Sequence, residues 1–133
     1  MYNVAIIGAG PAGIFAALEI MKLKPEWKVV LIEKGQRIEK RKCPIREGSP
    51  KCVNCKRCGL LCGWGGAGAF SDGKLNTGVK DSRSRKVLQE FVNCGAPEDI
   101  LYTTKPHIGT DKLKTTVKNL RKKIISLGAK INF

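Results

Sequence analysis

The sequence is poor in acidic residues, aromatic residues and long apolar runs. It holds 25 Lys and Arg but only 11 Asp and Glu in 133 residues, for a formal net charge of +14. Such an excess suits a polyanion. The aromatic residues are 6% of the chain, however, and are not interleaved with the cations, as stacking platforms for single strands require. We therefore do not expect nucleic-acid binding. Basic helix faces, or balancing acids in a missing part of the protein, account for the charge instead.

No apolar run is long enough for a signal sequence or a membrane-spanning helix. The chain passes from Met1 almost directly into the apolar residues 4–7, without a basic leader. These absences predict a cytoplasmic protein with no membrane partner. In that compartment the six cysteines are expected to be metal ligands or free thiols rather than disulfides. The length is enough for one domain with its own core.

The first 34 residues carry the pattern around which the rest is organised. Apolar runs at residues 4–7 and 29–32 flank a G-x-G-x-x-G motif and an amphipathic helix, which Pro25 ends. The apolar face of that helix consists of Ile14, Ala17, Leu18 and Met21. We therefore predict an α/β protein with a Rossmann-like βαβ unit. Because both strands are unbroken apolar runs, we expect a parallel sheet covered on both faces.

Each glycine of the motif has its own physical role. Gly8 lets the chain reverse, Gly10 lets the backbone approach a pyrophosphate, and Gly13 lets helix and strand pack closely. The first N–H groups of the helix attract an anion, so the predicted pyrophosphate site is Gly8, Ala9, Gly10, Pro11, Ala12 and Gly13. Glu33, about twenty residues after Gly13, is placed to accept hydrogen bonds from ribose hydroxyls. Its negative charge disfavours NADP at this site.

Residues 35–80 form an insertion that holds five of the six cysteines. Four of them follow C-x2-C-x2-C-x3-C, a spacing used for iron–sulfur ligation: Cys52, Cys55, Cys58 and Cys62. The spacing predicts a [4Fe–4S] cluster, and the alternatives are structural zinc, or metal-free thiols or a redox pair. Cys43 is an alternative fourth ligand. Cys94, by contrast, is predicted to be a small buried apolar residue.

A second glycine-rich stretch follows at residues 63–76. Its small residues allow the backbone to lie flat against a large planar or anionic ligand. Polar groups are available from Ser71, Asp72, Lys74 and Asn76. A flexible linker is the alternative, but a Gly/Ser spacer would not carry the apolar anchors Trp64, Phe70 and Leu75.

Residues 81–133 are predicted to be mainly helical and to end in a strand. Asp81 or Ser82 is predicted to cap one helix, which ends near residue 93, and Thr110 or Asp111 is predicted to cap another. The apolar face of the second helix consists of Leu113, Val117, Leu120, Ile124 and Leu127, with basic residues, including Arg121, elsewhere on its surface. Gly128 is the expected left-handed stop. Residues 129–133 then begin a strand that the chain does not finish.

With these motifs in view, the sequence resembles the NAD(P)/FAD-dependent oxidoreductases. G-A-G-P-A-G with L-I-E-K is general to flavoproteins. C-V-N-C-K-R-C with G-W-G-G-A-G-A-F-S-D-G-K-L-N, and later P-H-I-G-T-D-K-L, resemble a narrower group of FAD-dependent dehydrogenases with a cysteine-rich segment. The resemblance covers essentially the whole chain, as the N-terminal part of a protein several times longer. One portion of a FAD-binding domain is thus expected over residues 1–133, in three parts: 1–34, 35–80 and 81–133.

The resemblance implies FAD bound with its pyrophosphate at residues 8–13 and its adenosine ribose at Glu33, with Lys34 nearby. It suggests that the loop of residues 65–76, including Gly65 and Gly66, lies near the flavin. His107, the one histidine, is a candidate on the flavin side or the substrate side.

The implied activity is hydride or electron transfer through the flavin, with a small molecule or electron carrier as substrate. The missing C-terminal part of the protein is an expected partner, and the chain alone is expected to be too short for activity. No side chain is identified as catalytic. A non-enzymatic cysteine–metal module on a nucleotide-binding fold, or a basic nucleic-acid binder, are the alternative functions.

Overall fold

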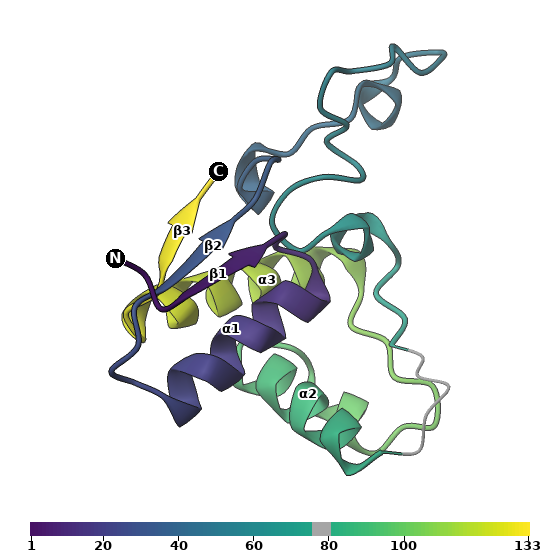
Figure 1. Ribbon diagram of the computed structural model, residues 1–133. Helices are drawn as coiled ribbons and strands as arrows, with labels where there is room; N and C mark the ends of the chain where they lie inside the picture. The colour runs from purple at the N-terminus through teal and green to yellow at the C-terminus, as the bar shows by residue number, and fades with distance from the viewer. Residues whose placement is uncertain (76–80) are drawn as a thin grey trace.

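The computed structural model describes residues 1–75 and 81–133, so the predicted contribution of Asn76 lies outside the described residues. The chain forms three strands, three α-helices and four short 3-10 helices in the described part (Figure 1). In chain order these are β1 (Val4–Ile7), α1 (Pro11–Leu23), β2 (Val29–Ile32), η1 (Ile38–Lys40), η2 (Pro44–Glu47), η3 (Ala67–Phe70), α2 (Ser82–Asn93), η4 (Glu98–Leu101), α3 (Thr110–Ser126) and β3 (Lys130–Asn132).

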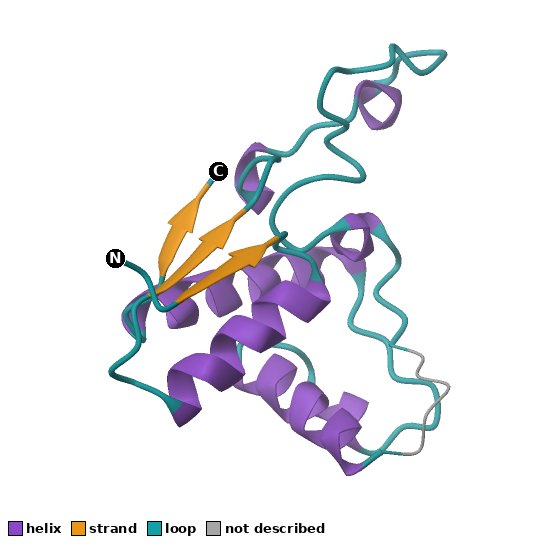
Figure 2. Cartoon of the chain, viewed as in Figure 1, coloured by secondary structure: helices purple, strands orange, loops and turns teal. Residues whose placement is uncertain are grey.

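The strands form one parallel sheet in the order β1-β2-β3. Ile6 lies opposite Leu31, which in turn lies opposite Ile131. Figure 2 shows the three strands side by side, with the helices gathered beside them. The predicted α/β class with a parallel sheet is therefore confirmed. The predicted final strand is present and pairs with β2 over three residues.

The core lies against one face of the sheet. Val29 and Leu31 are buried against the helices, and the predicted apolar stripe of α1 is buried as a whole. On the opposite face, Ile7 is 77% exposed and Ile32 is 41% exposed. The expectation of a sheet covered on both faces is thus wrong for the described part of the chain, because its helices pack on the other side.

Two of the helix ends agree with the sequence prediction, and one differs from it. Asp81 caps α2 as predicted, its side chain accepting from the Arg83 amide at 2.8 Å. Gly128 has φ +100° at the end of α3, which confirms the left-handed stop. The predicted cap of α3 is wrong, because Gly109 (φ +82°) precedes the helix and Thr110 lies inside it. The Thr110 hydroxyl instead donates to the Ser71 carbonyl.

Partly buried ion pairs join the helices, and the helical periodicity did not predict them. Arg121 was predicted on the solvated face of α3, but it is 9% exposed and donates to both carboxylate oxygens of Glu39 on η1, at 2.7 and 2.8 Å. Glu90 of α2 is buried between Lys22 of α1 and Lys123 of α3. These contacts hold α1, α2, α3 and η1 together. Within the described residues, no helix has both the length and the apolar character needed to cross a bilayer.

The Glu39–Arg121 pair predicts a pH-dependent contribution to stability. Hydrogen bonding to Arg121 lowers the pKa of Glu39 from an ordinary 4.5 to about 2. The pair therefore stabilises the fold fully above about pH 4.5, and this stabilisation disappears as the pH falls towards 2. Because the Glu39 side chain is 36% exposed, solvent screening limits the effect to about 1 kcal/mol.

We expect Glu39→Gln to lower the free energy of unfolding near neutral pH, and we expect most of this deficit to be lost near pH 2. Denaturant titrations at the two pH values measure this difference, with the exposed Glu26→Gln as the matched control. A Glu39→Gln deficit that is the same at both pH values would show that the charge of Glu39 is not responsible.

Candidate functional site

The glycine motif forms a tight turn between β1 and α1, and each glycine has the environment predicted for it. Gly8 has φ +98°, a backbone conformation that favours glycine. A Cβ on Gly13 would lie 2.0 Å from the Gly8 carbonyl oxygen, so only glycine allows this close packing. A Cβ on Gly10 would meet nothing within 4 Å. The backbone at Gly10 is therefore open to a ligand.

The start of α1 presents backbone donors to this open space. The Ile14 amide donates to the Gly10 carbonyl, which closes the first turn of the helix. Within the described residues, the amides of Gly10, Ala12 and Gly13 have no hydrogen-bond partner, and Pro11 has no N–H to offer. Pro11 and Ala12 are exposed. Three free donors at the positive end of a helix dipole favour an anion.

Glu33 follows β2 and joins the turn to the rest of the site. Its side chain is buried, and its carboxylate accepts hydrogen bonds from the amides of Ala9 (2.7 Å), Gly35 (2.8 Å) and Gly63 (2.9 Å). A carboxylate has about four lone-pair positions, so about one acceptor position is left for an external donor. The sequence predicted Glu33 as a ribose ligand, and its structural contacts were not foreseen. Lys34 beside it is exposed.

The second glycine-rich stretch lies directly against the glycine turn. The Gly65 amide donates to the Ala9 carbonyl at 2.8 Å. A Cβ on Gly66 would approach Gly10 Cα to 3.2 Å and Pro11 Cδ to 3.4 Å. Gly65 and Gly66, predicted from the sequence as cofactor-binding residues, are thus brought together with the predicted pyrophosphate site.

Apolar anchors fix this stretch, as predicted, so it is not a flexible linker. Trp64 is fully buried and its indole N–H donates to the Val117 carbonyl of α3 at 2.7 Å. Phe70 is 8% exposed. Anchored at both residues, the glycine backbone between them is held in place beside α1.

Arg41 is the main site residue that the sequence did not reveal. It is 5% exposed and donates to four carbonyl oxygens, those of Gly59, Leu60, Trp64 and Gly66, at 2.8 to 2.9 Å. Burial lowers the pKa of Arg41, and the negative charge of Glu33 opposes that shift. In the sequence Arg41 lies between two lysines in a charged segment, so no apolar period marks it as buried.

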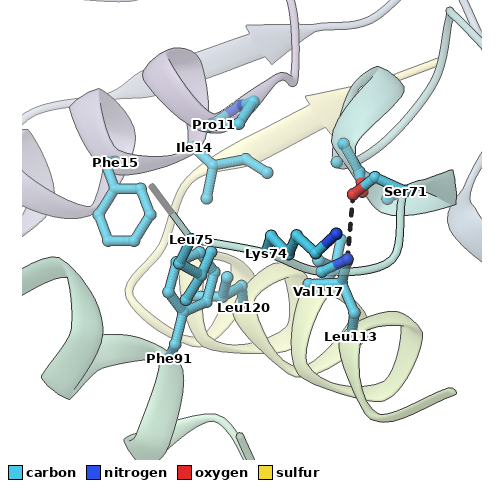
Figure 3. Close-up of a pocket in the computed structure, with 14 residues that line it drawn as sticks. Pro11, Ile14, Phe15, Ser71, Lys74, Leu75, Phe91, Leu113, Val117 and Leu120 are labelled. Carbon is cyan, nitrogen blue, oxygen red and sulfur yellow. Dashed lines mark hydrogen bonds between the residues drawn. The ribbon is translucent and has the colours of Figure 1, made fainter. Parts of the chain in front are cut away.

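An apolar cavity of about 190 Å³ lies beside the turn, between α1, α2, α3 and the second glycine-rich stretch (Figure 3). Pro11 and Gly65 form part of its wall next to the glycine turn. The polar side chains in the wall are Ser71 and Lys74, and the Ser71 hydroxyl accepts from the Gly73 amide at 3.2 Å. The apolar side chains that line it, besides Pro11, are Ile14, Phe15, Ala69, Leu75, Phe91, Leu113, Val117 and Leu120.

His107 is exposed and lies beside the second glycine-rich stretch. Lys74 and His107 form an isolated antiparallel bridge. The Leu75 amide donates to the Pro106 carbonyl at 2.9 Å, and the Ile108 amide to the Gly73 carbonyl at 3.0 Å. The pairing places His107 opposite one residue of the cavity wall, and its suggested role stays a prediction.

The predicted cysteine ligands lie in a segment that projects from the body of the molecule (Figure 1). Cys52 and Cys55 are exposed, whereas Cys43, Cys58 and Cys62 are half-buried, and all are free thiols. In the described part of the chain, no three His, Cys, Asp or Glu side chains gather to hold a metal ion. The present arrangement therefore does not fit a cluster or zinc, which stay predictions from spacing. Cys94 is buried as predicted, and burial raises the pKa of its thiol.

Fold and site together define an α/β protein with a parallel sheet and an open, donor-rich glycine turn. No protein-family model matches the chain. The chain is 43% identical over 128 residues to an uncharacterized protein of Clostridium beijerinckii (strain ATCC 51743 / NCIMB 8052). That match covers 96% of this chain and 24% of the relative, so the chain spans about a quarter of the length of the curated relative.

We predict that Glu33→Gln destabilises the protein by about 2 kcal/mol. The glutamine oxygen can replace one carboxylate oxygen, but its NH₂ group then faces a backbone N–H and leaves that buried donor unpaired. Denaturant unfolding measures the loss, with the exposed Glu26→Gln as control. Equal stability of the two variants would show that the three amide contacts of Glu33 do not hold the site together.

Proposed function

We propose that the chain binds FAD at the glycine turn, as the nucleotide-binding part of a flavin-dependent oxidoreductase with a Rossmann-like unit. The observation that carries this proposal is the set of glycine environments: left-handed backbone at Gly8, open space at Gly10, and close packing at Gly13. These are the three properties that a dinucleotide-binding turn requires.

The pyrophosphate is proposed to lie on the free amides of Gly10, Ala12 and Gly13. Backbone donors suit phosphate oxygens, and no side chain intervenes at Gly10. The remaining acceptor position of Glu33 suits a ribose hydroxyl. A carboxylate at this position favours an unmodified ribose over one that carries a 2′-phosphate, which agrees with FAD or NAD rather than NADP.

The ring system of the flavin is proposed to approach the apolar cavity beside Pro11 and Gly65. The cavity is mainly apolar, as a wall against a planar ring should be, and Ser71 and Lys74 supply polar groups at its edge. A Cβ on Gly65 would clash with Val117 and Ala69, and one on Gly66 would approach Gly10 and Pro11, so both glycines let this stretch pack closely beside the turn and the cavity.

When bound, FAD would supply hydride or single-electron transfer. The residues of this chain would bind and orient it: the turn holds the diphosphate, and Arg41 and Glu33 fix the loop above the turn. No side chain in the described residues is assigned a catalytic role. The proposed binding of FAD does not require an iron–sulfur cluster or zinc at the cysteines.

Oxidoreductase activity is proposed for a larger assembly than this chain. The chain spans about a quarter of its relative, and Ile7 and Ile32 leave an apolar sheet face open. In the described residues β1 pairs with β2 alone, so its other edge can accept a further strand. We propose that further polypeptide covers this face and edge and contributes the substrate site.

We expect Gly10→Val to weaken FAD binding at least about tenfold, because its side chain would occupy the open space over the free amides. Titration calorimetry with FAD, and with ADP as a competitor, measures this loss. Ala16→Val, an exposed change on the same helix, is the control and should bind within about twofold of the wild type.

Circular dichroism and thermal melting establish that both variants are folded. A folded Gly10→Val protein that binds FAD as tightly as the wild type would contradict the proposed site. Binding of FAD that ADP does not compete would likewise contradict the role of the turn.

A further inference from the structure

A second cavity, of about 360 Å³, lies between residues 35–42, which follow β2, and residues 57–62 of the cysteine segment. It is separate from the glycine turn, and Glu33 is not among the residues that line it. Four cations and two thiols share its wall: Lys40, Arg41, Lys42, Arg57, Cys58 and Cys62. We call this the basic thiol cavity.

All of the charged side chains that line the basic thiol cavity are positive. No acidic side chain is among the described residues that line it. Lys40, Lys42 and Arg57 are exposed, so their charged groups are free to meet a ligand. Arg41 donates to four backbone carbonyls and contributes a fixed positive charge in the wall. Converging cations of this kind concentrate small anions near the cavity.

The two thiols of the cavity differ from the outer pair in the same segment. The Cys62 amide donates to the Cys58 carbonyl at 2.9 Å, so a single turn of the chain separates the two residues, and both line the cavity. Both are half-buried. Cys52 and Cys55 are exposed and do not line the cavity. A ligand held by the cations would therefore lie next to Cys58 and Cys62.

We propose that the basic thiol cavity binds a small anionic disulfide, one that carries carboxylates, and captures half of it as a mixed disulfide on Cys58 or Cys62. The cysteine thiolate attacks one sulfur of the bound disulfide. A protein–ligand S–S bond forms as the ligand S–S bond breaks, and the leaving thiolate takes up the proton that the cysteine lost. The cysteine is oxidised and the departing half is reduced, so the exchange needs no other oxidant. It also needs no nucleotide and is independent of the FAD proposal.

The test is the rate and position of reaction with disulfides of different charge. The fully reduced protein is treated with glutathione disulfide (anionic), 2-hydroxyethyl disulfide (neutral) or cystamine (cationic), and modified peptides are quantified by mass spectrometry. We expect glutathione disulfide to modify the inner cysteines, Cys58 or Cys62, before the outer cysteines, Cys52 and Cys55. The ratio of the reaction rate with the anionic probe to that with the cationic probe should be at least about tenfold higher at the inner cysteines than at the outer ones. This difference should decrease at high salt.

Matched double variants test the role of the cations. Lys42→Gln with Arg57→Gln removes two of the four cations of the cavity and should lower the charge preference at Cys58 and Cys62 at least about threefold. Lys51→Gln with Lys56→Gln, which removes two lysines of the same segment outside the cavity, should leave it intact. In the wild type, a dicarboxylate without a disulfide should slow the reaction of the inner cysteines alone. This measurement does not depend on how the variants fold.

The proposal is overturned if Cys52 and Cys55 react first with all three probes. It is also overturned if the charge preference is equal at the inner and outer cysteines, or if the folded Lys42→Gln, Arg57→Gln protein keeps the full preference of the wild type. A dicarboxylate that slows all four cysteines alike would overturn it as well.

Discussion

The contact on which the site depends is the buried carboxylate of Glu33 with three backbone amides. Ala9 belongs to the glycine turn, Gly35 follows β2, and Gly63 begins the second glycine-rich stretch. One side chain therefore joins three segments that are far apart in the sequence. Because an isolated buried carboxylate is costly, these amides must stay in place for the charge to be tolerated. The arrangement of the turn and the loop above it follows from this requirement.

Arg41 complements Glu33 with the opposite charge and the opposite kind of partner. The carboxylate accepts hydrogen bonds from backbone amides, while the guanidinium donates hydrogen bonds to the carbonyls of Gly59, Leu60, Trp64 and Gly66. Together, Glu33 and Arg41 form hydrogen bonds with the backbone amides and carbonyls of a loop that forms no strand or long helix. This explains how a stretch so rich in glycine holds a defined position against α1. The same Arg41 lies between the glycine turn and the basic thiol cavity, so one residue supports both sites.

The sequence predicted the elements and the turn because their signals are local. The apolar stripe of α1, the stop at Gly128 and the roles of Gly8, Gly10 and Gly13 depend on neighbours within a few residues. Arg41, and the pair of Arg121 with Glu39, depend on partners 18 to 82 residues away, which no periodic pattern encodes. The open sheet face was not predicted, because unbroken apolar strands indicate two covered faces, whereas the helices of the described residues pack on one face only and leave Ile7 and Ile32 exposed.

The most direct test of the account is to observe the amides that are proposed to hold the diphosphate. In a two-dimensional NMR titration of ¹⁵N-labelled protein with ADP, the resonances of Gly10, Ala12 and Gly13 should shift and saturate together. The amides of Cys52 and Cys55, on the projecting segment, should not move. Saturating shifts confined to other parts of the chain, with these three unchanged, would contradict a nucleotide site at the start of α1.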